Sequence, residues 1–443
     1  MENHFIEFYT SDNFPGLTEH PERRRLDTEF HARPPIPLEG PTLVSHLVFL
    51  HDSGGNYMVD LEHLDRFNAD GSWEVYESTD AYRWYQRHGV CMRYELHTEF
   101  SSYTFFLPLP IISIQEELTL DECTRNWITS IPGQLLVATN IELQSAEVIQ
   151  PGKKIAEVST PCNQTVVTRV VDGKGWIFTD FKIVNGASNF LLINSGLTPR
   201  QAGRTVQRLW EIETYRVTAL LGLPVAKAIT VSLRGAEEKL ADMMDHICSS
   251  RSSEDECAVL DELIQLAAEV EHSVARTTFR FSATRAYEAI VMQRISELRE
   301  QRVEGFPTIL ELMNRRLMPP VSTCAAMARR QDDLSARVAR NSQLLRTRID
   351  LALKRQNQLV LAQMNHRARL QLRLQETVEG LSIIAITYYG SQLVRYITEG
   401  ASKIWNGLSP EYATAISIPL IAITVALSLR GMRQHLEDMK IQD

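Results

Sequence analysis

One helix-compatible stretch, Val321–Glu379, limits the folds open to this chain more than any other feature. It contains no proline or glycine, the residues that most often end a helix. At 1.5 Å per residue such a helix is about 90 Å long, whereas globular helices average about 11 residues. It runs directly into two apolar segments, Leu381–Ile397 and Tyr412–Leu429. The pattern predicts a stalk helix that leads into a membrane hairpin.

The second apolar segment is the clearer membrane candidate. Tyr412–Leu429 holds 18 residues without a charge, between Glu411 and Arg430. That length is just sufficient to span a bilayer, and Pro419 within it is tolerated in membrane helices.

The first apolar segment is more polar, and by itself Leu381–Ile397 suits a buried core helix equally well. A spanning second segment changes this, because the chain must first reach the membrane, and Thr398–Pro410 is a suitable connector. The alternative is a helical hairpin docked on a soluble domain. In a membrane, polar side chains favour a partner helix or an aqueous lumen, which gives three candidate pore residues: Tyr388, Ser391 and Gln392.

Charge gives the hairpin an orientation. Residues 1–320 carry 30 Lys and Arg against 45 Asp and Glu, whereas residues 321–443 carry 16 against 10. The connector has only Lys403, while arginines flank the hairpin on its other side at positions 367, 369, 373, 430 and 433. The positive-inside rule then predicts a multi-pass membrane protein, in a bacterial inner membrane, with both termini cytoplasmic.

A basic rear beside apolar segments favours the lipid bilayer as a partner rather than nucleic acid. The six cysteines are scattered without a C-x-x-C pair, which indicates free thiols in a reducing compartment. The N-terminus has no apolar core typical of a signal peptide.

The front of the chain predicts a mixed α+β cytosolic domain. Strand-like runs occur at Thr42–Leu50, Val90–Leu107 and Gln134–Leu143, and Asp172-Gly173 predicts a hairpin between Thr165–Val171 and Trp176–Val184. The first 41 residues, with Pro34 and Pro35, are expected to be loop.

From Thr198 the pattern becomes helical. Thr198 is a suitable N-cap with Pro199 at the first helical position, and the helix is expected to end at Pro224. Ser253 and Glu256 form a capping-box pattern that opens a second long helix to about Val303. An interrupted apolar seam in the stalk makes an antiparallel or coiled-coil helical stalk and a homo-oligomer plausible. The predicted organisation is a cytosolic domain at 1–196, a helical region at 197–320, a basic stalk helix at 321–380, a first span at 381–397, an outer loop at 398–411, a second span at 412–430 and a tail at 431–443.

One strand-like run carries candidate metal ligands. Glu95, His97 and Glu99 alternate along Val90–Leu107, so on a strand they would share one face and could hold a hard or borderline metal ion. A solvated strand face with incidental ion pairs is the commoner use of such a pattern. His46 and His51 lie upstream and could approach it.

A loop at His31 and Arg33 and a charged pair at Glu213 and Arg216 each allow a structural interpretation as well as a functional one. His31 and Arg33, in a proline-bounded loop, could bind an anion or simply hold the loop to its domain. Glu213 and Arg216 are three apart on a helix, which indicates an ion pair more than a catalytic acid. No phosphate-binding loop, dinucleotide fingerprint, nucleophile elbow or zinc-protease motif occurs, so an enzyme is not expected and the cofactor remains unknown.

Several segments together resemble a bacterial family, the domain of unknown function 3422, described as membrane-anchored proteins. The segments that carry the resemblance are 29–34, 97–100, 207–216, 315–317, 344–348 and 371–382, within residues 20–397. Where that family has a Trp-Glu-Arg run before its His-Thr-Glu, this chain has Tyr94-Glu95-Leu96. The resemblance implies a membrane anchor and no particular activity.

The predicted layout is also similar to the two-span CorA-type magnesium channels. Their Gly-Met-Asn signature is missing, and the connector offers only Trp405-Asn406-Gly407. Two functions therefore stand side by side. The chain is either a membrane-anchored scaffold or ligand sensor, or an oligomeric cation channel whose pore is lined by the first span.

Overall fold

The computed structural model describes most of the chain, in nine ranges: residues 19–31, 34–51, 57–68, 71–79, 81–109, 122–159, 165–249, 253–402 and 410–439. The chain divides into two compact units. The first comprises residues 1–249 and 261–340, and the second comprises residues 250–260 and 341–443.

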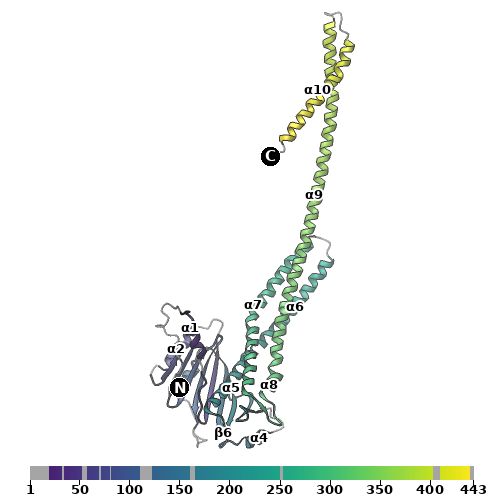
Figure 1. The fold of residues 1–443 in the computed structure, drawn as a ribbon. Helices are drawn as coiled ribbons and strands as arrows, with labels where there is room; N and C mark the ends of the chain where they lie inside the picture. The colour runs from purple at the N-terminus through teal and green to yellow at the C-terminus, as the bar shows by residue number, and fades with distance from the viewer. Residues whose placement is uncertain are drawn as a thin grey trace, which may run out of the picture. The chain divides into compact units, whose positions relative to one another are not determined.

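The first unit is built on a mixed sheet (Figure 1). Over the described residues, its ten strands follow the order β10-β7-β8-β9-β6-β1-β5-β4-β3-β2. The strands are β1 Thr42–Leu50, β2 Glu74–Ser78, β3 Tyr82–Arg87, β4 Val90–Leu96, β5 Phe100–Pro108, β6 Gln134–Ser145, β7 Val166–Val170, β8 Gly175–Val184, β9 Ala187–Asn194 and β10 Gln301–Arg302. Neighbouring strands are antiparallel except for the parallel pair β6 and β9.

Helices cover both faces of this sheet and form the second unit. They are α1 Arg23–His31, α2 Tyr57–Phe67, α3 Glu122–Thr129, α4 Pro151–Val158, α5 Pro199–Leu220, α6 Gly222–Ser249, α7 Ser253–Leu298, α8 Ile309–Arg316, α9 Met318–Ser402 and α10 Pro410–Met439.

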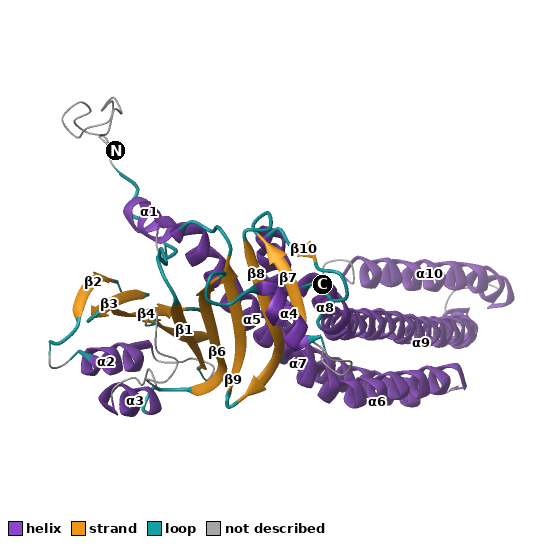
Figure 2. Cartoon of the chain, turned by 90° about the horizontal axis from the view of Figure 1, so that it is seen from below, coloured by secondary structure: helices purple, strands orange, loops and turns teal. Residues whose placement is uncertain are grey.

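Two apolar cores lie on opposite faces of the sheet, because side chains alternate along a strand. On one face, Val44 and Ile141 pack with Leu209 of α5. On the other, Tyr94 and Phe105 pack with helices α2 and α3, which lie beside the β1–β4 end of the sheet (Figure 2). Helix α5 therefore covers the face on which the site described below lies.

Several sequence predictions are confirmed. Strand β1 has the predicted bounds, and the hairpin β7–β8 turns through Val171–Lys174, where Asp172 and Gly173 have φ of 58° and 83°. Thr198 caps α5 in a capping box with Gln201.

Other predictions are wrong at the ends of elements. Residues 23–31 form α1 rather than loop, because the prolines that forbid helix lie beyond its end. Pro224 and Pro319 lie in the first turns of α6 and α9, where a missing backbone N–H costs nothing. Helices α5, α6 and most of α7 share one compact unit with the sheet, whereas the sequence placed a domain boundary at residue 196.

The second unit contains most of α9 and all of α10. Helix α9 runs without interruption for 85 residues and includes the first apolar segment. Ile421 of α10 packs against Gly390 of α9, where an added Cβ would lie 3.2 Å from its side chain. Positions 390 and 421 are about equally distant from the connector, so this contact pairs the helices as an antiparallel hairpin.

Two stretches among the described residues are long and apolar enough to cross a membrane, Pro199–Ser249 and Glu411–Ser428. The first joins α5 and α6, and the burial of α5 against the sheet explains much of its apolar composition. None of the second is buried. Leu381–Ile397 is not among these stretches, and this finding leaves the predicted membrane hairpin unconfirmed.

The close approach of α5 to the loop before β1 depends on a glycine. A Cβ at Gly203 would lie 1.9 Å from the carbonyl oxygen of Ile36, which is backbone and cannot rotate away. We expect Gly203→Ala to destabilise the first unit by about 1–3 kcal/mol through overpacking, measured by urea denaturation in mild detergent. Gly235→Ala in α6 is the matched control, since nothing lies within 4 Å of its Cβ position. The control should be neutral or stabilise by up to about 1 kcal/mol. Equal effects of the two substitutions would contradict the close approach.

Candidate functional site

The sheet face beneath α5 carries a buried polar layer. On β4, Met92 and Tyr94 point to the α2–α3 core, and Arg93 and Glu95 alternate with them toward α5. The cross-strand neighbours of these two residues on β5 and β1 are also polar and buried: Ser102, Thr104 and His46. Burying polar groups costs free energy unless they find partners. The polar layer therefore differs from an ordinary apolar core, and a role in binding could explain it.

His46 is held as a neutral imidazole at the centre of the layer. Its Nδ1 hydrogen-bonds with Thr104 Oγ1 at 2.8 Å and its Nε2 with Thr214 Oγ1 at 3.1 Å. Burial lowers the pKa of His46 well below its ordinary value, and the charge of Arg93 lowers it further. Its ring stacks on Trp210 of α5 at 5.4 Å between centroids.

Arg93 is a fully buried cation with long contacts. Its guanidinium lies over Trp210 at 5.2 Å and donates to Glu95 Oε2 at 3.3 Å and to the carbonyl of Pro34 at 3.4 Å. Its Nε finds no hydrogen-bond partner among the described residues. Trp210 is thus packed by both His46 and Arg93, which ties α5 to two strands.

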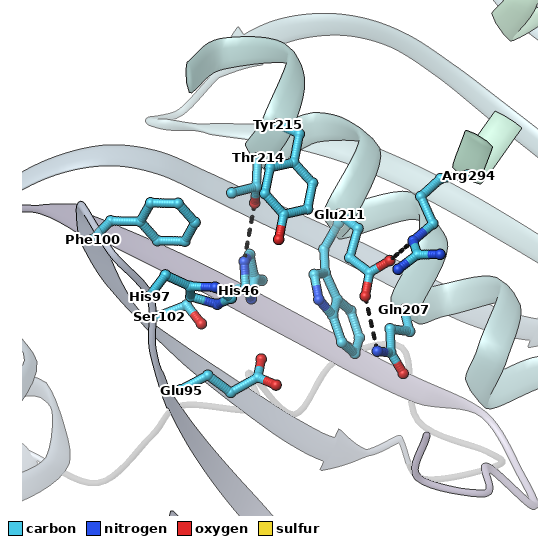
Figure 3. A pocket seen from close by; sticks show the side chains of 11 residues that line it. His46, Glu95, His97, Phe100, Ser102, Gln207, Glu211, Thr214, Tyr215 and Arg294 are labelled. Atoms are coloured by element: carbon cyan, nitrogen blue, oxygen red, sulfur yellow. Dashed lines mark hydrogen bonds and ion pairs between the residues drawn. The ribbon is translucent and has the colours of Figure 1, made fainter. Parts of the chain in front are cut away.

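A cavity of about 240 Å³ opens between the polar layer and α5 (Figure 3). It is lined by His46, Glu95, His97, Phe100, Ser102, Gln207, Trp210, Glu211, Thr214, Tyr215 and Arg294. Glu95 lines it from the sheet and Glu211 from α5, with the Glu211 carboxylate turned toward Gln207 and Arg294. Ser102 is only 1% exposed, and its Oγ has no hydrogen-bond partner among the residues that the structure describes.

The Glu211 carboxylate is mostly buried, and an ion pair and a hydrogen bond offset part of the cost of burying its charge. Arg294 of α7 forms an ion pair with its Oε2, and Gln207 Nε2 donates to Oε1 at 2.9 Å. Burial raises the pKa of Glu211 above its ordinary value, and the charge of Glu95 adds to the rise, although Arg294 and Gln207 oppose it. The negative charges of Glu95 and Glu211, which line the cavity from opposite walls, therefore repel each other.

The geometry assumed for the predicted metal site is wrong. Strand β4 ends at Leu96, so His97 and Glu99 lie in the turn before β5 and do not continue the strand face of Glu95. Glu99 turns to α7, where Arg280 Nη2 and the Tyr287 hydroxyl each donate to it at 2.7 Å. Within the described part of the chain, no three His, Cys, Asp or Glu side chains are placed to hold a metal ion. His97 and Glu95 do line the same cavity, together with His46.

Other predicted residues have different outcomes. His51 contacts Asp60 of α2 at 3.0 Å and does not line the cavity. Glu213 and Arg216 form the predicted ion pair at 2.7 Å. The predicted anion loop falls outside the description, since Arg33 is not among the described residues and only the backbone of His31 is described.

The three candidate pore residues differ in exposure along α9. Tyr388 is 58% exposed, Gln392 is half-buried and Ser391 is buried, with its hydroxyl donating to the carbonyl of Tyr388 at 2.8 Å. Their role in a pore requires several copies of the chain and remains a prediction.

Sequence reasoning missed Ser102, Trp210 and Arg93 as members of the site. A single serine or arginine in a strand carries no signal of its own. The available signal was the run of polar residues at alternate positions on β4 and β5, in strands whose other face is aromatic. The segment 207–216, noted for its resemblance, supplies five lining residues of the cavity.

The chain belongs to a family of uncharacterised proteins: residues 18–436 match the family described as Protein of unknown function (DUF3422). The match covers nearly the whole chain and confirms the resemblance seen in the sequence. No curated protein and no solved structure matches the chain. The family name carries no activity, so function has to be argued from the site.

The neutral state of His46 predicts a pH dependence of stability. Below its ordinary pKa of about 6.5 the unfolded chain binds a proton at this position while the folded chain does not. Stability should therefore fall as pH drops from about 7 to about 5, with up to about 1.4 kcal/mol per pH unit from this group. Urea denaturation of wild type and His46→Gln should show a shallower loss in the variant. His246→Gln, at an exposed position on α6, should follow wild type, and parallel profiles for all three proteins would contradict the assignment.

The Glu99 contact predicts a second stability effect. Glu99→Gln leaves Arg280, whose side chain is 20% exposed, without its carboxylate. We expect a loss of about 2–4 kcal/mol in unfolding free energy, because a partly buried charge is left uncompensated. Glu238→Gln removes an exposed pair with Arg234 and should cost less than about 1 kcal/mol. The double variant Glu99→Gln/Arg280→Met should recover part of the loss, and simple additivity would exclude the coupling.

Proposed function

We propose that this protein is a membrane-attached small-molecule sensor, in which the first unit binds a ligand and the second unit attaches to a lipid bilayer. The observation that carries the proposal is the polar cavity beneath α5. Structural cores are normally apolar and filled, whereas this one retains an open space lined by two carboxylates and by a Ser102 hydroxyl that has no hydrogen-bond partner among the described residues. A small polar ligand would satisfy this hydroxyl.

The cavity also has a physical connection to the long helices of the first unit. Arg294, which lines it, lies on α7, and Tyr287 of α7 stacks on the lining residue Tyr215 at 5.5 Å. Tyr287 also donates to Glu99 in the turn that follows His97. A ligand that moves His97 or Tyr215 would therefore act on α7, which is what a sensor requires.

Membrane attachment is supported by the exposed apolar surface of the second unit. Ile416, Leu420, Ile423 and Leu427 of α10 are each at least 60% exposed. An apolar helix surface of this length is unfavourable in water and favourable in a bilayer. The arginines before and after the hairpin in the sequence favour both termini in the cytoplasm of a bacterial inner membrane, with two spans.

The cavity is tested by ligand occupancy. The full chain in mild detergent should retain a small molecule in native mass spectrometry, or gain thermal stability with members of a metabolite set. Ser102→Phe fills the cavity and should abolish either effect, whereas Ser102→Ala removes one hydrogen bond and should only weaken it, with near-ultraviolet circular dichroism as the check on folding. A Ser102→Phe variant that binds as wild type does would exclude the cavity as the site.

Membrane attachment is tested by flotation with liposomes after an alkaline wash. The full chain should float, and Leu420→Arg/Ile423→Arg should not, because each arginine costs about 2.5–3.5 kcal/mol at the centre of a span. The control Ile183→Arg replaces a side chain of β8 that is 75% exposed in the first unit, and this variant should float as wild type does. Recovery of the unchanged protein in the aqueous fraction would contradict the attachment.

The alternative, an oligomeric cation channel, rests on the polar residues of the first apolar segment. Thr387 Oγ1 in this segment is buried and has no hydrogen-bond partner among the described residues, which favours some polar partner there. Mass measurement in mild detergent separates the two functions. A closed ring would favour a pore around Ser391, and a monomer or dimer would exclude it.

A further inference from the structure

We propose that the cavity beneath α5 binds a small organic cation, whose ammonium or guanidinium group lies between the carboxylates of Glu95 and Glu211. The inference rests on the proposed function of this cavity as a ligand site and names the class of ligand. Glu95 lies on β4 and is 5% exposed, and the side chain of Glu211, on α5, is 16% exposed. Both side chains line the same cavity, and the Glu211 carboxylate is turned toward Gln207 and Arg294 (Figure 3).

The two carboxylates favour a ligand that donates, because an ionised carboxylate can only accept hydrogen bonds. Glu95, Glu211 and the buried Ser102 hydroxyl all present oxygen atoms to the cavity. Ser102 is the independent sign of a ligand, since a hydroxyl buried without a partner is costly. Carboxylates bind N–H donors of cations with short, strong hydrogen bonds.

The nearby cations are already engaged. Arg294 is the single cationic side chain of Lys or Arg type among the described lining residues, and it pairs with Glu211 and with Glu297 at 3.1 Å. Arg93 lies over Trp210 and donates to Glu95. The same contacts engage the two carboxylates, but each carboxylate oxygen keeps a further lone pair that can accept a hydrogen bond from a ligand. An anionic ligand would be repelled by the carboxylates, whereas a cationic ligand would relieve their mutual repulsion.

The cavity suits an organic cation rather than a metal ion. Its volume of about 240 Å³ is close to that of eight liquid waters, far more than a single ion needs. The two carboxylates come from opposite walls, and no three metal-ligating side chains converge within the described residues. The volume instead suits a compact amine or guanidine of metabolite size.

Ligand charge also predicts a direction for the pH dependence. Burial and the charge of Glu95 raise the pKa of Glu211, so this carboxyl takes up a proton at a higher pH than an ordinary glutamate does. A cation requires the ionised form, so its affinity should increase as pH rises through the titration of this carboxyl, with proton release on binding. A neutral ligand would show no such release.

The test uses the full chain in mild detergent and four probes of similar chain length: butylamine, agmatine, 1-butanol and butyrate. Isothermal titration calorimetry should detect saturable binding of butylamine or agmatine, and none of 1-butanol or butyrate. Glu95→Gln and Glu211→Gln should each weaken the binding of the cation at least about tenfold, equivalent to about 1.4 kcal/mol. Glu157→Gln, at a side chain 63% exposed on α4, is the matched control and should leave it unchanged.

The outcomes separate this inference from the proposed function. Binding of butyrate or 1-butanol that is lost in Ser102→Phe would overturn the cation assignment and leave the cavity a ligand site. Failure of both cations to bind at millimolar concentration would also overturn it. If either glutamate variant fails to fold, the pH dependence of cation binding by the wild-type chain decides, and affinity that does not rise with pH would contradict the inference.

Discussion

The packing of Trp210 with His46 and Arg93 is the interaction on which the site depends. It brings a helix residue into contact with two side chains from β1 and β4. Because Arg93 is fully buried, its charge is stabilised, among the described residues, by this ring, by Glu95 and by the carbonyl of Pro34. Moving α5 away from the sheet would expose the guanidinium and remove the cavity-lining residues that α5 supplies. The cavity therefore exists only while α5 lies in its position against the sheet.

Side chains alternate between the two faces of β4 and β5, so the sheet has an aromatic face and a polar face. Tyr94 and Tyr103 face the aromatic core beneath α2, while their neighbours Glu95 and Ser102 face α5. A shift of one residue in the pairing of β4 with β5 would exchange these faces. The aromatic core thus fixes the register that brings Glu95 to the cavity. The pairing of β4 with β5 therefore determines both the aromatic packing on one face and the polar lining of the cavity on the other.

The sequence predicted the elements whose signals are local. Thr198 with Pro199 located the start of α5, Asp172-Gly173 located a hairpin, and the absence of breakers located α9. Strands β2 and β3 were missed because their charged and aromatic residues alternate without a clear apolar face. The shared strand face assumed for the metal ligands was wrong because His97 and Glu99 lie beyond the end of β4, and strand ends are decided by tertiary pairing. The cavity joins residues from positions 46 to 294, which no local pattern brings together.

The short strand β10 has a consequence for how the first unit folds. Thr168 of β7 donates to the carbonyl of Gln301 across a sequence separation of 133 residues, which includes α5, α6 and α7. The edge of the sheet is therefore completed only after the long helical excursion has formed and returned. Such non-local closure is slow and leaves the β7 edge open to other chains in the meantime. On the ribosome, the sheet must wait for a segment made long after its other strands. Until β10 has been made, Thr168 and Arg169 at the edge of β7 lack the strand partners that they have in the folded chain.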